Sequence, residues 1–156
     1  MMTLSPPTIE LRQATLGDAP ALAALLLEMN DGQAESLVQH DIERMHGILA
    51  EMARYPDFRA YLLLRDGHLV GSFSLLVFGG PSHDGVPQAL LDGVVIARAV
   101  RATGLGQAMM EHAFNLARAA GCYKMSLSSS LKRQDAHRFY TQLGFDQHGI
   151  SFSVTL

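Results

Sequence analysis

Two glycines in the C-terminal half stand where the backbone can approach a ligand closely. Gly104 and Gly106 follow Arg101, between an apolar run and an amphipathic segment. Glycine lacks a Cβ, so its N–H group is unobstructed. The first N–H groups of a helix have no intrahelical partner and lie at the positive end of its dipole, which favours an anion. Segment 101–106 therefore predicts a pyrophosphate site, although a glycine-rich turn that only starts a helix has the same pattern.

Two other phosphate-binding motifs fit this segment less well. A P-loop has Lys and then Ser or Thr after its glycines, whereas Gln107 and Ala108 follow here. A dinucleotide-binding fingerprint has a third glycine, and Met109 occupies that position.

One carboxylate stands in an otherwise apolar run that extends from Leu90 to Val95. Asp92 there can orient a water molecule or accept a proton from a reacting group. An outward-facing acid near the end of a strand is the alternative, and the residues alone leave both readings open.

A second patch, residues 136–145, reads AHRFYTQLGF. With segment 101–106 before it, this patch resembles the signatures of the GCN5-related N-acetyltransferases (GNAT), which move an acetyl group from acetyl-CoA to an amine. The family's first signature begins with Arg or Gln, has Gly three positions later, and has Gly or Ala two positions after that. Arg101, Gly104 and Gly106 match these positions, whereas the family often has Gly where Ala102 stands. Residues 92–145 are also similar to glucosamine-6-phosphate N-acetyltransferases and to small bacterial acetyltransferases.

The resemblance implies acetyl-CoA as the co-substrate and no metal. It implies cofactor contacts from the strand before the loop, from the loop and helix start, and from the later short helix. These residues are Val94, Val95, Ile96, Arg101, Ala102, Thr103, Gly104, Leu105, Gly106, Gln107, Arg133, His137 and Tyr140. Many members have Asn where Arg133 stands, so Arg133 contacts a CoA phosphate, an acidic acceptor group or only solvent. His137 can share a helical face with Tyr140, or it can be a surface histidine.

The same resemblance implies two catalytic residues. Acetyl transfer releases a thiolate, and Tyr140 would donate a proton to that sulfur. The alternative for Tyr140 is a ring buried in the core with a satisfied hydroxyl group. Asp92 matches an acidic residue of the glucosamine-6-phosphate enzymes and would accept the amine proton, directly or through water.

Acidic residues gather where the family binds its acceptor. Glu28 and Asp31 begin a stretch without Lys or Arg that ends before Arg44. Such a rim would attract a cationic amine, and we expect Glu28 and Asp31 to contact it. Solvated helix ends would produce the same composition.

The hydrophobic pattern predicts the elements that position these residues. We expect strands over 9–13, 60–64, 69–78, 89–97, 124–128, 145–147 and 151–156. We expect helices over 19–29, 36–53, 104–120 and 134–143. Asp18 is expected to cap the first helix, and Asp66-Gly67 to turn a hairpin.

This order and the resemblance imply one N-acetyltransferase domain over 1–156, of the α/β (α+β) class, with residues 1–8 disordered. The implied GNAT fold has a mixed, twisted sheet of six to seven strands and about four flanking helices. Its fourth and fifth strands splay apart, and the thioester lies between them.

The composition of the chain limits the classes of partner that we expect it to bind. The chain has 156 residues, 48% hydrophobic and 17% charged, which is typical of one globular domain. Its formal charge of -3 disfavours nucleic acid. A signal peptide and a membrane-length apolar stretch are not evident, so we expect a cytoplasmic protein without a membrane partner. The lone cysteine, Cys122, is expected to be a small buried residue rather than a nucleophile.

We therefore predict transfer of an acetyl group from acetyl-CoA to the primary amine of a small molecule, by direct attack in a ternary complex. Two alternatives remain: a non-catalytic acyl-CoA sensor on the same fold, and an N-acetyltransferase for proteins or peptides. A homodimer is expected by analogy with the family.

Overall fold

The strands of the computed structural model, which describes residues 4–29 and 39–156, form a mixed sheet. Its order is β1-β2-β3-β4-β5, antiparallel up to β4, with β5 parallel to β4. The strands are β1 Ile9–Gln13, β2 Phe58–Arg65, β3 His68–Phe78, β4 Gln88–Ile96 and β5 Met125–Ser126. The predicted mixed α/β architecture is confirmed.

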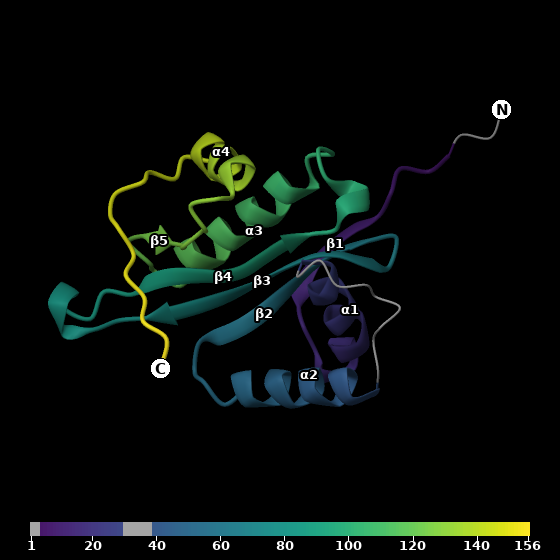
Figure 1. Cartoon of the computed structure of the whole chain (residues 1–156), viewed down its shortest axis with the longest axis horizontal. Helices are drawn as coiled ribbons and strands as arrows, with labels where there is room; N and C mark the ends of the chain where they lie inside the picture. Colours follow the sequence, from purple (N-terminus) through teal and green to yellow (C-terminus); the bar gives the residue numbers. More distant parts are fainter. Residues whose placement is uncertain (1–3, 30–38) are drawn as a thin grey trace.

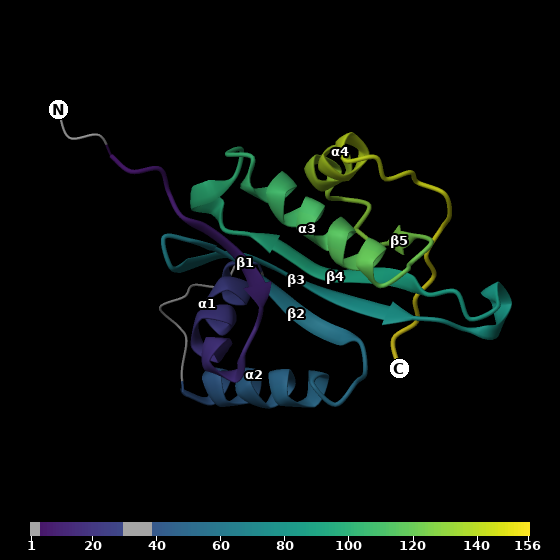
Figure 2. The same ribbon diagram turned by 180° about the vertical axis from the view of Figure 1, so that it is seen from behind.

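Helices cover both faces of the sheet (Figures 1 and 2). They are α1 Ala19–Met29, α2 Gln39–Met52, α3 Leu105–Ala119 and α4 Gln134–Gln142. Helices α3 and α4 lie on one face, and α1 and α2 on the other. Over the described residues, none of the helices combines the length and apolarity that crossing a bilayer requires.

Each face has its own hydrophobic core because side chains alternate along a strand. On β2, Leu63 packs in the core beneath α3, with Phe73 and Met109. Leu62 and Leu64 point the other way, into the core that α1 and α2 cover. The sheet is therefore buried on both sides along β2 and β3, which explains their nearly continuous apolar sequence.

The predicted hairpin joins β2 to β3. Asp66 and Gly67 both have positive φ, 49° and 78°, as a two-residue hairpin turn with the right twist requires. The Asp66 carboxylate also accepts a hydrogen bond from the N–H of Thr8, at 2.8 Å, so the turn holds the chain just before β1.

The predicted role of Asp18 as the cap of α1 is wrong. Asp18 ends a short 3₁₀ turn, Leu16–Asp18, and its carboxylate accepts a hydrogen bond from the N–H of Thr15 at 2.7 Å. Two further hydrogen bonds, both 2.8 Å, join it to the Arg12 guanidinium. A charged partner on β1 therefore draws the carboxylate away from the helix that follows it.

The pairing of β4 with β3 is irregular next to Asp92. Ser72 pairs with Val95 and Ser74 with Asp92, so Phe73 faces both Gly93 and Val94. This is a β-bulge, and Gly93 takes the positive φ of 59° that such a bulge often needs. On its other edge β4 pairs with β5 only through Ala89 and Leu90. Beyond Leu90 the two strands part, as the predicted splay requires.

Within the described residues the sheet has five strands rather than the expected six to seven. Residues 145–147 and 151–156, predicted as strands, are not part of the sheet, and β5 is shorter than the predicted 124–128. Alternation in sequence can predict an extended conformation, but a strand also needs a neighbour to accept its hydrogen bonds. Helix α2 begins at Gln39, and residues 36–38 of the predicted helix lie outside the described residues.

Candidate active site

The start of α3 presents unpaired amide groups at the end of β4. The first helical hydrogen bond is donated by Ala108 N to Gly104 O, at 3.1 Å. The N–H groups of residues 104–107 make no hydrogen bond within the described part of the chain. Arg101 to Gly104 are exposed, and Leu105 and Gly106 are half-buried. An accessible row of donors at the positive end of a helix of this length suits a diphosphate.

The two glycines of the loop do different things. Gly104 caps α3 with a φ of 83°, and a Cβ there would meet nothing within 4 Å. A Cβ on Gly106 would instead lie 3.4 Å from Phe139 Cζ and 3.6 Å from Ile96 Cγ1. Gly104 therefore borders the open space where an anion would lie, whereas Gly106 faces the packed contact of α3 with β4 and α4.

Ala102 adopts a backbone conformation that favours glycine. Its φ is 61°, in the left-handed region. Alanine there costs about 1–2 kcal/mol relative to the right-handed region. This position often has Gly in the family that the sequence resembles, and the positive φ is the physical reason.

Three side chains tie the loop to its surroundings. Arg101 Nε donates to Ile96 O at 3.1 Å, so the guanidinium folds back over the end of β4. The Thr103 hydroxyl donates to Val100 O. Glu28, at the end of α1, accepts a hydrogen bond from Arg98 N at 2.5 Å. The last contact joins α1 to the 3₁₀ turn Arg98–Val100 and was not evident from sequence, because the two residues are distant along the chain.

Tyr140 lies on α4 with its ring packed into the core beneath α3. Its ring centroid is 5.5 Å from that of Phe139 and 5.7 Å from that of Phe145. Burial raises the pKa of Tyr140, and the positive charge of Arg133 opposes this in part. Its hydroxyl group makes no hydrogen bond within residues 4–29 and 39–156. At neutral pH the phenol therefore keeps its proton and has it available for a ligand.

Two other residues predicted to contact the cofactor, Arg133 and His137, lie at the start of α4. Arg133 is the exposed residue that precedes the helix. His137 donates from Nε2 to Ser130 O at 2.8 Å, which fixes the loop between β5 and α4. Ser129 lies in the same loop and was not evident as a functional residue from sequence. Its buried hydroxyl has no hydrogen-bond partner in the described structure, and such a group ordinarily has one.

Asp92 lies next to the bulge of β4, opposite Ser74. Its neighbour Leu91 is buried in the core beneath α3. Asp92 is exposed, and strand alternation points it to the opposite face, the face that α1 and α2 cover elsewhere. Val94, Val95 and Ile96 follow Gly93 in the part of β4 that has no β5 partner. Asp92 and Tyr140 thus belong to opposite sides of the sheet, at the strand that borders the split.

Comparison with known proteins identifies the family of this chain. The sequence profile described as the acetyltransferase (GNAT) family matches residues 24–145. The chain belongs to the GNAT acetyltransferase family. It is an N-acetyltransferase, and this family takes its acetyl group from acetyl-CoA.

Three similar proteins show how far the likeness extends. The aminoalkylphosphonate N-acetyltransferase of Salmonella typhimurium is 31% identical over 150 residues, 96% of this chain and 93% of that protein. The glucosamine 6-phosphate N-acetyltransferase of Trypanosoma brucei brucei is 35% identical over 82 residues, 53% of this chain and 54% of that protein. A solved structure of an Agrobacterium tumefaciens protein has a TM-score of 0.83 at 28% identity, covering 94% of this chain and 99% of that one.

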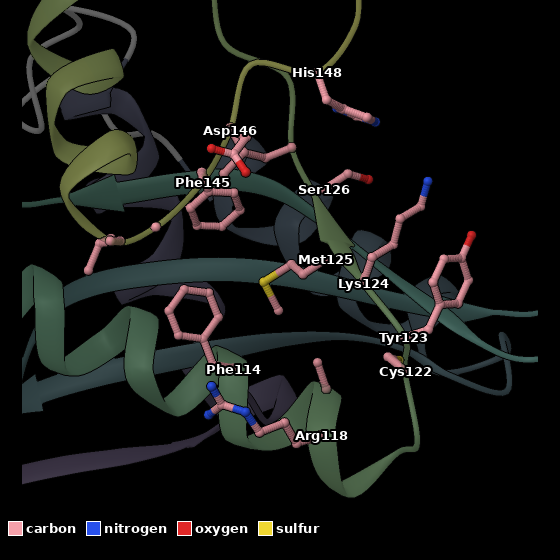
Figure 3. A pocket seen from close by; sticks show the side chains of 14 residues that line it. Phe114, Arg118, Cys122, Tyr123, Lys124, Met125, Ser126, Phe145, Asp146 and His148 are labelled. Carbon is pink, nitrogen blue, oxygen red and sulfur yellow. The ribbon is translucent and has the colours of Figure 1, made fainter.

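A pocket of about 560 Å³, shown in Figure 3, is lined by residues outside the loop at the start of α3. It opens beside β5, between the C-terminal end of α3 and residues 143–148. Cys122 lines it, and burial, with a smaller effect of the Asp57 charge, raises the pKa of that thiol. None of the predicted cofactor or catalytic residues of the acetyltransferase lines this pocket.

The predicted acceptor contacts are only partly described. Glu28 holds the Arg98 amide, and its contact with an amine stays a prediction. Asp31 lies outside the described residues.

Proposed function

We propose that this acetyltransferase moves the acetyl group of acetyl-CoA to the primary amine of a small molecule, by direct attack in a ternary complex. The observation that carries the proposal is the accessible row of unpaired amides at the start of α3, beside the split between β4 and β5. A diphosphate held there would direct its attached arm along the unpaired edge of β4.

The residues of the chain have separate roles in this scheme. The amides of residues 104–107 and the charge of Arg101 bind the pyrophosphate of acetyl-CoA. The loop residues Ala102 and Thr103 surround it, and the backbone of Val94, Val95 and Ile96 holds the pantetheine arm. Arg133 and His137 border the cofactor from α4.

Proton transfers accompany the attack. The amine nitrogen forms a bond to the thioester carbonyl carbon, and the bond from that carbon to sulfur breaks. Tyr140 donates its proton to the leaving sulfur. Its hydroxyl group has no partner among the described residues, and its raised pKa keeps it protonated at neutral pH. Asp92, or a water molecule that it orients, accepts the proton released by the amine. Tyr140 and Asp92 belong to opposite sides of the sheet. This supports a scheme in which the cofactor enters from one face and the acceptor from the other.

Attack without an acyl-enzyme is supported by the surroundings of Cys122. Its raised pKa keeps the thiol protonated near neutral pH, whereas the thiolate is the reactive form. The thiol also lines the pocket beside β5 rather than the loop of α3.

The preferred acceptor that we propose carries both a primary amine and a phosphorus oxyanion. The Salmonella relative is named for aminoalkylphosphonates and the Trypanosoma relative for glucosamine 6-phosphate. Both names combine an amine with a phosphonate or phosphate group on a small molecule.

We further propose that the enzyme works in the cytoplasm as a homodimer, without a nucleic acid or membrane partner. The formal net charge of -3 supports the last point, the lack of nucleic acid and membrane partners, because net negative charge repels nucleic acids and anionic lipids.

The test is release of CoA thiol with matched pairs of acceptors. The pairs are 2-aminoethylphosphonate with ethylamine, and glucosamine 6-phosphate with glucosamine; polyamines, aminoglycosides and peptides complete the panel. We expect kcat/KM at least about tenfold higher for the member with phosphorus, which corresponds to about 1.4 kcal/mol. Binding of CoA without thiol release for any amine would instead support the sensor, and release with peptides alone would support a protein acetyltransferase.

A further inference from the structure

Helix α1 contacts the turn that precedes the loop of α3. Glu28, in the last turn of α1, accepts a hydrogen bond at its Oε1 from the backbone N–H of Arg98, at 2.5 Å and across 70 positions of the chain. A hydrogen bond to a carboxylate is stronger than one between neutral groups. Arg98 lies three residues before Arg101, so this negative charge stands near the proposed anion site and opposes a diphosphate there. The carboxylate therefore has a role other than binding the anion.

The turn held by this bond leads directly into the strained part of the loop. Arg98 begins the 3₁₀ turn, and Val100 at its end is buried. The carbonyl oxygen of Val100 accepts a hydrogen bond from the Thr103 hydroxyl. Ala102, with its φ of 61°, lies between these two residues. A strained conformation persists only where the surrounding structure holds it, so the position of the turn determines the position of the loop.

The sheet holds the same turn from its other side. Ala97 N donates to Val70 O at 2.8 Å, and Arg101 Nε donates to Ile96 O at 3.1 Å. These bonds fix the turn to β3 and β4. Glu28 instead belongs to a helix on the face opposite α3, so its bond makes the turn depend on α1 as well (Figure 1).

The second carboxylate oxygen of Glu28 is open to a ligand. Oε2 has no hydrogen-bond or ion-pair partner within residues 4–29 and 39–156, and the side chain is half-buried. Glu28 lies on the side of the sheet to which Asp92, the proposed base, also belongs. A carboxylate has acceptor sites on both oxygens, so it can bridge two donors. An ammonium group is a donor of the matching charge.

We propose that Glu28 is a positioning residue that links the two substrate sites. Its Oε1 holds the turn before the cofactor loop, and its Oε2 receives the ammonium group of the acceptor. Each ligand then orders a side chain that the other one needs, so CoA and acceptor bind cooperatively, by the same factor in either order. The role rests on the proposed function, because it takes the loop of α3 as the CoA site. Glu28 acts through binding alone, and the proton transfers stay with Asp92 and Tyr140.

Calorimetric titration with CoA tests the positioning. We expect Glu28→Ala to weaken CoA binding about tenfold, and Glu28→Gln, which keeps an oxygen for the Arg98 amide, to restore most of that loss. Removal of a negative charge would by itself strengthen the binding of a diphosphate, so weaker binding has the sign that positioning requires. Glu51→Ala is the matched control, since it removes the same charge from α2, where Glu51 pairs with Arg54. No weakening by Glu28→Ala, or equal weakening by Glu51→Ala, would overturn the proposal.

The same titration in saturating 2-aminoethylphosphonate tests the link to the acceptor. CoA carries no acetyl group, so the two ligands do not react. We expect the Kd of CoA to fall about fivefold for the unaltered chain and for Glu51→Ala. It should stay unchanged for Glu28→Gln, whose amide NH₂ cannot accept a hydrogen bond from an ammonium group. Ethylphosphonate, which lacks the amine, should leave the Kd unchanged for every chain.

Two kinds of failure remain distinguishable in these titrations. An unaltered chain that does not bind CoA would reject the proposed function itself. An unaltered chain that binds CoA, but shows no cooperativity or shows cooperativity that persists in Glu28→Gln, would reject only the link through Glu28.

Discussion

Tyr140 is the residue whose environment bears most directly on the proposed chemistry. Its ring contacts those of Phe139 and Phe145, and burial raises its pKa, so the hydroxyl stays protonated at neutral pH. Its contribution to the rate can be separated from its packing, since phenylalanine retains the ring.

Tyr140→Phe should lower kcat by about 10²-fold or more, because a positioned general acid contributes that much. Affinity for CoA should stay nearly unchanged, since the ring and the loop of α3 remain. Thiol-release kinetics and calorimetric titration with CoA measure the two quantities. An unchanged kcat would remove Tyr140 from the mechanism.

Ala102 is a residue at which the native sequence is not the most stable choice. Its φ of 61° is unfavourable for alanine and open to glycine. Ala102→Gly should therefore raise the free energy of unfolding by about 1 kcal/mol, after allowance for the greater freedom of glycine in the unfolded chain. Denaturant unfolding measures the change.

Ala120→Gly is the control for this substitution. Ala120 ends α3 with a φ of -80°, so glycine gains nothing there, and we expect no increase in stability. Equal effects of the two substitutions would show that the backbone at Ala102 is not strained.

At the scale of elements, the start of α3 combines the proposed anion site with a tight helix contact. The different surroundings of Gly104 and Gly106 separate these two functions. Gly104→Ala introduces a methyl group at positive φ on the open side, and should cost about 1 kcal/mol of stability and weaken CoA binding about tenfold or more.

Gly106→Ala is the matched variant, because its methyl group would contact Phe139 at an ordinary distance. We expect its CoA affinity to stay within about twofold of the unaltered chain, as the small cost of a tolerated contact implies. Calorimetric titration of both variants with CoA measures the two affinities. Equal loss of affinity in both would argue against an anion site on the side of Gly104.

A second element-scale feature is the ion pair that joins β1 to the turn before α1. Arg12 donates two hydrogen bonds to Asp18, and this pairing lowers the pKa of Asp18 to about 2 from 3.8. Since the pKa is lower in the folded state, the stabilisation is complete above pH 3.8 and is lost as the pH falls towards 2. With screening at the surface, we expect a contribution of about 1–2 kcal/mol near neutral pH.

Asp18→Asn should remove that contribution at neutral pH and leave stability nearly unchanged near pH 2. Unfolding midpoints over this range measure the effect. Glu10→Gln is the control, since Glu10 also pairs with Arg12, at 3.3 Å, but is more exposed than Asp18. A constant difference between Asp18→Asn and the unaltered chain at all pH values would contradict this account.

At the scale of the whole molecule, the proposed ligand site lies where the two layers of helices meet at one strand. The loop of α3 contacts β4, α4 and, through Glu28 and Arg98, the end of α1. A ligand held there would be linked to both faces of the sheet, so its binding should stabilise the whole fold.

CoA at a concentration of 100 times its Kd should raise the free energy of unfolding by about 2.7 kcal/mol. For a domain of this size that corresponds to a rise in Tm of roughly 5–10 °C. Pantetheine, which lacks the diphosphate, should raise Tm much less at the same concentration. Similar shifts with both compounds would show that the amides of α3 do not bind the diphosphate.

Local pattern was sufficient for the features that depend on neighbours in the chain. Apolar periodicity predicted the four helices and the first four strands, Asp66-Gly67 predicted the hairpin, and the two motifs predicted the family. These succeed because helix periodicity, strand alternation and turn preferences act over a few residues. The placement of Gly104 at the start of α3 followed for the same reason.

Contacts between distant parts of the chain decided the rest. Glu28 reached the Arg98 amide 70 positions along the chain, and pairing of β4 with β3 produced the bulge beside Asp92. Asp18 turned to Arg12 on β1, six positions earlier, instead of capping α1. The positive φ of Ala102 and the unpaired residues 149–156 likewise became evident only in three dimensions. A sequence specifies which residues can form a strand, a bond or a turn, but the geometry of the folded chain determines which partners are within reach.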